Sequence, residues 1–182
     1  MIILASKSPR RKELLKTLID DFIILPSNID ESAYSIEEVS LKKAEAISLT
    51  YPNDYILSAD TYVIYKDIIF GKPKDKIDAF NTLSLLQDKT HTVVTYFTIL
   101  NKNKNICVTK KVVTNVTFKK MDEEKINLYV ASNSPLDKAG SYGIQDNDKY
   151  DFIDSIEGSL TNVIGLPLEE LKKTLIKLNI IK

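Results

Sequence analysis

Leu4-Ala5-Ser6-Lys7-Ser8-Pro9-Arg10-Arg11 carries a short apolar strand directly into the first turn of a helix. Ser8 suits the N-cap and Pro9 the first helical position, because serine accepts from a free N–H and proline has none to lose. Free backbone N–H groups at a helix start attract anions, and Arg10 and Arg11 add guanidinium groups that suit phosphate oxygens. The stretch therefore predicts a local anion site, against the alternative of an ordinary turn with solvated arginines.

Strand-like and helix-like segments alternate along the 182 residues, which predicts a mixed α/β fold. Residues 101–105 join two long strands into an antiparallel pair, so the sheet is expected to be mixed. The predicted strands are 2–5, 22–26, 55–59 (ending at Asp60), a hairpin within 62–70 that turns at Lys66-Asp67, 91–100 and 106–118. The predicted helices are 9–19, 36–49, 75–86, 121–131 and 167–178.

The length and composition predict one compact domain, with two tight lobes as the alternative, and no nucleic-acid or membrane partner. Hydrophobic residues make up 43% of the chain, and 25 basic residues balance 25 acidic ones, so no overall field favours polyanions. The single cysteine, Cys107, excludes an internal disulfide framework. No signal peptide or membrane-spanning segment is expected. We therefore expect a cytoplasmic protein.

Polar residues gather where the predicted strands end. Asp60 directly follows an apolar strand, where open α/β sheets place functional groups, although a turn or helix cap is the competing interpretation. Lys72 lies on a stiff turn between Gly71 and Pro73, which suits either a phosphate contact or a solvated loop. The Asp30-Glu31 pair could bind a divalent cation or simply be exposed. Lys43, on a predicted helix, is the weakest of these candidates taken alone.

His91 is the only histidine. It has no second histidine or neighbouring cysteine with which to form a zinc site, so a structural role is expected. Neither the glycine-rich dinucleotide fingerprint nor a P-loop is present, which argues against a dehydrogenase or kinase.

Five motif blocks, in order, resemble the Maf family of nucleoside triphosphate pyrophosphatases. The resemblance covers essentially the whole chain, and its closing part is Asn162-Val163-Ile164-Gly165-Leu166-Pro167-Leu168. The five blocks are Leu4 to Leu15, Asp30-Glu31, Lys43-Ala44, Ala59-Asp60-Thr61 leading to Gly71-Lys72-Pro73, and Asp137-Lys138-Ala139-Gly140-Ser141-Tyr142-Gly143-Ile144-Gln145.

The resemblance implies a single Maf-like domain over residues 1–182. Its fold would be a mixed, extended, twisted sheet with flanking helices and two lobes around a deep cleft, similar to inosine triphosphate pyrophosphatases. It also implies a homodimer.

The implied reaction is hydrolysis of a nucleoside triphosphate between the α and β phosphates. By the same resemblance, Asp60 accepts the proton of the attacking water and binds a divalent metal, Mg²⁺ or Mn²⁺, together with Glu31. The residues implied to hold the phosphates are Ser8, Arg11, Lys43 and Lys72.

Three positions resemble the dTTP/UTP pyrophosphatase type and not the type that acts on 7-methyl-GTP: Arg10, Thr61 and Gln145. A glutamine amide donates and accepts at once, which suits the edge of a uracil or thymine ring. The implied substrates are dTTP and UTP, with modified pyrimidine nucleotides also possible, in a house-cleaning or division-linked role. The alternatives are a nucleotide-binding regulator of cell division with little catalysis and a purine-directed inosine triphosphate-type enzyme.

Two departures from the family pattern stand near these motifs. Ser58 replaces a frequent glycine before Ala-Asp-Thr, and Asp146-Asn147-Asp148 replaces a more glycine-rich turn after Gln145. We expect these departures to affect loop shape and rate and to leave the reaction type unchanged.

Overall fold

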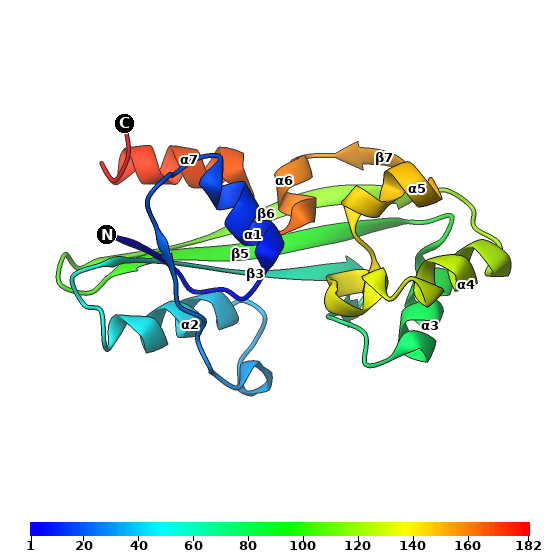
Figure 1. Cartoon of the computed structure of the whole chain (residues 1–182), viewed down its shortest axis with the longest axis horizontal. Helices are drawn as coiled ribbons and strands as arrows, with labels where there is room; N and C mark the ends of the chain where they lie inside the picture. The colour runs from blue at the N-terminus through cyan, green and yellow to red at the C-terminus, as the bar shows by residue number, and fades with distance from the viewer. The chain divides into compact units, whose positions relative to one another are not determined.

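The computed structural model describes all 182 residues, which fall into two compact units (Figure 1). Unit 1 comprises Met1–Asp60, Thr95–Val112 and Gly165–Lys182. Unit 2 comprises Thr61–Val94 and Val113–Ile164. The chain passes from the first unit to the second between Asp60 and Thr61.

Seven strands form one open, mixed, twisted sheet in the order β2-β1-β3-β5-β6-β7, with β4 paired to β3. β1 is parallel to both β2 and β3, whereas β3–β4 and β6–β7 are antiparallel. The mixed α/β sheet predicted from the sequence is therefore confirmed. The strands are β1 (Ile2–Leu4), β2 (Ile23–Ile24), β3 (Tyr55–Tyr65), β4 (Ile68–Phe70), β5 (Thr90–Asn101), β6 (Ile106–Phe118) and β7 (Ile153–Glu157).

The long strands β5 and β6 are antiparallel, as predicted. In unit 1 the hydroxyls of Thr98 and Thr109 lie 2.8 Å apart. In unit 2 Thr90 is paired in the same way with Thr117, also at 2.8 Å. The residue number in β6 rises as the number of its partner in β5 falls, which is the register of an antiparallel hairpin.

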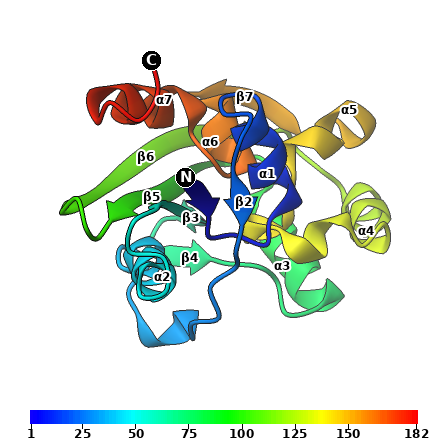
Figure 2. The ribbon, with the colours of Figure 1, turned by 60° about the vertical axis from the view of Figure 1, so that its left-hand side comes forward.

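In unit 1, helices cover both faces of the strands, because neighbouring strand residues point to opposite faces. Leu4 and Leu57 pack with α1 (Pro9–Lys16) and α7 (Leu168–Lys177) on one face. Ile3 and Ile56 pack with α2 (Val39–Ser48) on the other. Figures 1 and 2 show α7 and α1 on one side of these strands and α2 on the opposite side.

Unit 2 has its own core, built on two helices. α3 (Lys76–Leu86) and α4 (Glu123–Ala131) contribute Leu83 and Tyr129 to it, and the strands contribute Val63 and Phe118. The other helices of unit 2 are short: η2 (Ser134–Asp137), η3 (Ala139–Ser141), η4 (Ile144–Asp146), α5 (Asn147–Tyr150) and α6 (Leu160–Ile164). η1 (Glu31–Ala33) is the one short 3₁₀ helix of unit 1.

One predicted boundary is wrong in a way that matters for the site. Strand β3 does not end at Asp60 but continues to Tyr65. Asp60 can occupy a position within a strand because Lys43 of α2 pairs with its carboxylate. The carboxylate therefore has a partner without being placed in an exposed loop. Asp60 is therefore a strand residue, held more rigidly than a loop residue.

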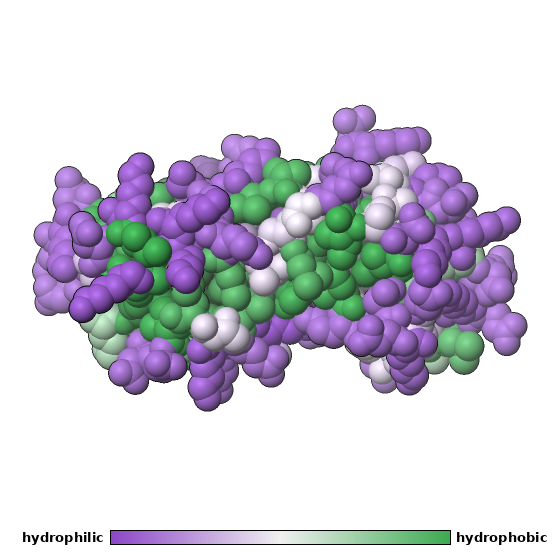
Figure 3. All heavy atoms as spheres, turned by 90° about the horizontal axis from the view of Figure 1, so that it is seen from above, coloured by the Kyte–Doolittle hydropathy of each residue, from purple (hydrophilic) through white to green (hydrophobic).

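No helix is long and apolar enough to cross a membrane. Figure 3 shows one face, on which hydrophilic side chains surround exposed hydrophobic ones. The exposed large hydrophobic residues include Leu160 of α6 and Ile176 of α7.

Candidate functional site

The start of α1 is built around two serine hydroxyls. Ser8 is the N-cap, as predicted, and its Oγ accepts from the Arg11 backbone N–H at 3.4 Å. The Ser6 Oγ accepts from the Ser8 N–H at 3.2 Å and from the Arg11 Nη1 at 3.5 Å. The Arg11 Nε donates to the Gly165 carbonyl at 2.7 Å. Arg11 is thus held from two sides, and Ser6, which the sequence did not single out, is one of its supports.

Lys43 is the centre of a compact ion cluster in unit 1. Its side chain is only 10% exposed, and its Nζ lies 2.8 Å from a Glu31 carboxylate oxygen and 3.5 Å from an Asp60 oxygen. Three residues from α2, η1 and β3 therefore converge on one point. A buried ammonium needs such partners, because burial without them costs several kcal/mol.

The adjacent acidic residues Asp30 and Glu31 have different partners. Asp30 caps η1, and its Oδ1 accepts from the Ser32 hydroxyl at 2.6 Å and from the Ser32 N–H at 3.1 Å. The hydrogen bond from the Ser32 hydroxyl lowers the pKa of Asp30. Asp30 thus shapes the turn, and Glu31 is the member of the pair that meets Lys43.

A buried hydroxyl ties the strand of Asp60 to the helix of Lys43. Ser58, fully buried two residues before Asp60, donates to the Ser40 carbonyl on α2. Ser40 in turn lies 2.9 Å from the Thr98 hydroxyl of β5. This small ladder fixes the spacing between β3 and α2 close to the ion cluster, a role that no sequence pattern indicated.

Unit 2 holds Thr61, Lys72 and Gln145, whereas Arg10 lies in unit 1. The Gly140 N–H donates to the Gly71 carbonyl at 3.0 Å, which joins the loop of Lys72 to the motif that ends in Gln145. Gly140 has a φ of +68°, and a Cβ there would lie 2.5 Å from a Val63 methyl carbon. Only glycine suits this position.

The remaining predicted residues differ in exposure. Lys72 and Gln145 are exposed, whereas Arg10 and Thr61 are half-buried. Each has a surface that a ligand can reach, which phosphate or base recognition requires. Their proposed roles remain predictions.

His91 lies in the aromatic core of unit 2. It is 2% exposed, its Nε2 lies 2.7 Å from the Tyr142 hydroxyl, and its ring meets Phe118 edge-on at 4.7 Å. Burial lowers the pKa of His91 to about 4. The imidazole is therefore neutral at pH 7, and its packing is consistent with the predicted structural role.

The donor set in unit 1 fits a hard divalent cation that shares its ligands with phosphates. Glu31 and Asp60 both reach one cationic atom, the Lys43 Nζ, so two carboxylates can serve one cation. Mg²⁺ commonly takes one or two carboxylates together with substrate phosphates and waters. The structure contains no group of three or more His, Cys, Asp or Glu side chains placed so that they could hold a metal ion. Glu31 and Asp60 would suit a cation that takes its remaining ligands from phosphates and waters.

These features define an α/β protein with a charged cluster of one lysine and two carboxylates. The chain belongs to the Maf family, since the family's model, described as Maf-like protein, matches residues 1–178. This confirms the family predicted from the five motif blocks.

Similar proteins of known name cover nearly the whole chain. A dTTP/UTP pyrophosphatase of Clostridium botulinum (strain Eklund 17B / Type B) is 43% identical over 183 residues, which cover 96% of this chain and 97% of its own. A dTTP/UTP pyrophosphatase of Bacillus anthracis is 43% identical over 186 residues, which cover 98% and 96%. The Staphylococcus aureus Ham1 protein has a similar solved structure, with a TM-score of 0.58 at 12% identity over 97% of this chain and 98% of that one. The last similarity concerns the fold alone.

Proposed function

We propose that this protein hydrolyses dTTP and UTP to the nucleoside monophosphate and pyrophosphate. The observation that carries the proposal is the buried Lys43 ammonium between Glu31 and Asp60, in a chain more than 40% identical to proteins named dTTP/UTP pyrophosphatase. A protein that only binds nucleotides needs cationic side chains near the phosphates but has little use for a carboxylate beside them. The Asp60 carboxylate favours hydrolysis over binding alone.

Hydrolysis at the α phosphorus requires a positioned water, a proton acceptor and positive charge near the phosphates. In our proposal Asp60 accepts the water's proton, which a carboxylate within reach of the water can do. Lys43, Arg11 and Lys72 offset the phosphate charge, and Ser8 supplies a helix N-terminus that favours anions.

Glu31 and Asp60 are the residues that would hold Mg²⁺ or Mn²⁺. When bound, the metal would neutralise phosphate charge and orient the substrate. Lys43, which pairs with both carboxylates, would keep them close together in the absence of the metal.

Base selection is assigned to Arg10, Thr61 and Gln145. The Gln145 amide is exposed and can both donate to and accept from a pyrimidine edge. A wrong base would leave such a polar group unpaired, which lowers its binding.

The proposed enzyme is a cytoplasmic homodimer. Its one cysteine, Cys107, is free and exposed, which agrees with a reducing compartment, and the dimer is inferred from the family resemblance. Sedimentation equilibrium of the full chain tests the dimer: a single species of twice 20.6 kDa is expected, and a species of 20.6 kDa would contradict it.

The experiment that tests the function is pyrophosphate release from a panel of nucleoside triphosphates with Mg²⁺. We expect fast release from dTTP and UTP, slow release from purine nucleotides, and a loss of about 10³-fold in kcat for Asp60→Asn. Release of orthophosphate in place of pyrophosphate, or equal rates for the variant, would contradict the proposal. Preference for inosine triphosphate would favour the purine-directed alternative.

A further inference from the structure

The turn from Gly143 to Asp146 carries Gln145 in unit 2. It is closed by a backbone hydrogen bond in which the Asp146 N–H donates to the Gly143 carbonyl at 3.0 Å. Gly143 is buried and Gln145 is exposed. The turn therefore has a buried backbone at Gly143 and an exposed side chain at Gln145.

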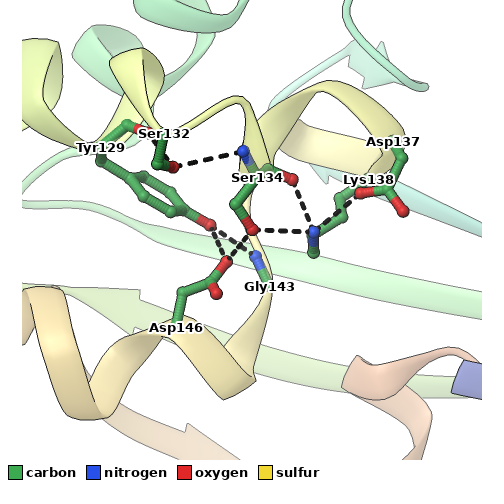
Figure 4. Close-up of polar contacts among 7 residues, drawn as sticks. All are labelled: Tyr129, Ser132, Ser134, Asp137, Lys138, Gly143 and Asp146. Atoms are coloured by element: carbon green, nitrogen blue, oxygen red, sulfur yellow. Dashed lines mark hydrogen bonds and ion pairs between the residues drawn. The ribbon is translucent and has the colours of Figure 1, made fainter.

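One tyrosine hydroxyl holds both ends of this turn, as Figure 4 shows. The Gly143 N–H donates to the Tyr129 hydroxyl at 2.9 Å, and that hydroxyl donates to the Asp146 Oδ2 at 2.7 Å. Tyr129 is a buried residue of α4. Burial raises its pKa, so the hydroxyl keeps the proton that it donates to Asp146.

A second hydroxyl meets the same carboxylate oxygen (Figure 4). The Ser134 Oγ donates to the Asp146 Oδ2 at 2.7 Å. The Lys138 Nζ donates to the Ser134 Oγ at 3.0 Å and lies 2.7 Å from an Asp137 oxygen. Asp146 is thus bound from α4 and from η2, and a charged group supports the second contact.

The direction of the Asp146 side chain is itself informative. Asp146 stands at the N-cap of α5, where aspartate commonly accepts from the helix's own N–H groups. Here its side chain makes no such cap bond. The carboxylate instead binds Tyr129 and Ser134, so its interactions serve the preceding turn.

The anchored end of the turn is in close contact with the Gln145 amide. A Cβ placed on Gly143 would lie 2.5 Å from the Lys138 Cε and 3.2 Å from the Gln145 Oε1. The Gln145 amide oxygen therefore lies close to the Gly143 backbone, whose N–H is fixed by Tyr129. A shift of the anchored backbone would move the amide with it.

We propose that Asp146 and Tyr129 are positioning residues that orient Gln145 and so set the preference for uracil and thymine over other bases, cytosine included. This inference rests on the proposed function, in which Gln145 contacts the base. A turn in which side chains hold both ends needs no glycine flexibility, which accounts for aspartate at the position after Gln145.

Steady-state kinetics with dTTP, UTP, CTP and GTP test this role. For Asp146→Ala we expect KM for dTTP and UTP to rise about tenfold, and the preference for UTP over CTP to fall by a similar factor, because the lost contacts act on binding. The kcat should stay within about threefold, since Asp60 and Lys43 are untouched.

Two further variants separate positioning from mere stability. Asp146→Asn keeps an oxygen that accepts from Tyr129 and Ser134, and we expect it to restore KM and base preference to within about twofold of the wild type. Asp148→Ala removes the same charge from an exposed position two residues away and should behave as the wild type. A purely structural role would lower the melting temperature of Asp146→Ala and leave base preference unchanged.

An unchanged UTP-to-CTP preference in folded Asp146→Ala overturns the inference. If that variant does not fold, Ser134→Ala removes one of the two hydrogen bonds to Asp146, and a preference reduced about threefold supports the role while an unchanged preference overturns it. A wild-type protein that releases no pyrophosphate from any nucleotide refutes the proposed function. Wild-type release from UTP with unchanged preference in the variants refutes the positioning role alone.

Discussion

The polar clusters of the two units are built in different ways. In unit 1, Lys43 meets Glu31 and Asp60, so charge faces charge. In unit 2, Gly143 and Asp146 meet at the hydroxyl of Tyr129, a neutral group held in the core. The first arrangement suits an ionic substrate and proton transfer, and the second suits the fixed geometry that recognition of a neutral base requires.

In our proposal the two clusters divide the work: Lys43, Glu31 and Asp60 serve the chemistry, and the turn held by Tyr129 serves base selection. Charges that pair with one another can exchange those partners for phosphates or a metal without leaving a charge exposed to an apolar interior. A buried hydroxyl offers no such exchange, because losing its partners leaves an unsatisfied polar group. We therefore expect variants of the Lys43 cluster to alter rate and variants of the turn held by Tyr129 to alter preference or stability.

A large effect is expected from Lys43→Met, which breaks the charged cluster. It leaves Glu31 and Asp60 to repel each other and removes a cation from the phosphates, so kcat/KM for UTP should fall by about 10²- to 10³-fold. Lys42→Met is the matched control, because Lys42 pairs with Glu45 on the helix surface at 2.9 Å. If both variants lose the same activity, the cluster has no special role.

A second prediction concerns the neutral core of unit 2 and its response to acid. The folded pKa of His91, about 4, lies below the ordinary value near 6.5, so the unfolded chain takes up the proton first as the pH falls. Stability should therefore be lost between about pH 6.5 and pH 4, by about 3 kcal/mol in total.

Urea unfolding at pH 7 and pH 4 measures this loss. His91→Gln can still hydrogen-bond to Tyr142 but does not titrate, so its stability should depend less on pH by about the same 3 kcal/mol. Equal pH dependence in both proteins would show that His91 does not control the acid response.

The smallest effect is expected from Ser58→Ala, which loosens the ion cluster without touching it. The variant loses the hydrogen bond to the Ser40 carbonyl, and we expect about 1 kcal/mol less stability and a fall of a few-fold in kcat. Thr109→Val, at the outer end of the same hydroxyl ladder, is the control that should lose stability with kcat unchanged. A Ser58→Ala variant with wild-type kcat would show that the ladder does not set the Lys43–Asp60 spacing.

Local sequence patterns predicted the parts of the fold that depend on neighbouring residues. The Ser8 cap with Pro9 behind it, and the hairpin that turns at Lys66-Asp67, are confirmed. Both follow from capping chemistry and apolar alternation within a few residues. The alternation of segments and the connection at residues 101–105 also predicted the mixed sheet, and the resemblance predicted the family.

The errors arise where distant contacts decide. Asp60 was predicted to end its strand, because periodicity does not reveal that Lys43 will meet its charge. The short helices from Ser134 to Tyr150 and strand β7 were not predicted, since they lack a clear apolar period. The turn near Gln145 is held by Tyr129, which is distant in sequence, so only the folded chain reveals it.

The central claim is that chemistry depends on the Asp60 cluster and base preference does not. Pyrophosphate release by Asp60→Asn, measured as kcat/KM with UTP and then with CTP, tests it most directly. We predict that both rates fall together by about 10³-fold and that the UTP-to-CTP ratio is preserved. Rates within tenfold of the wild type, or a ratio that collapses, would contradict the account.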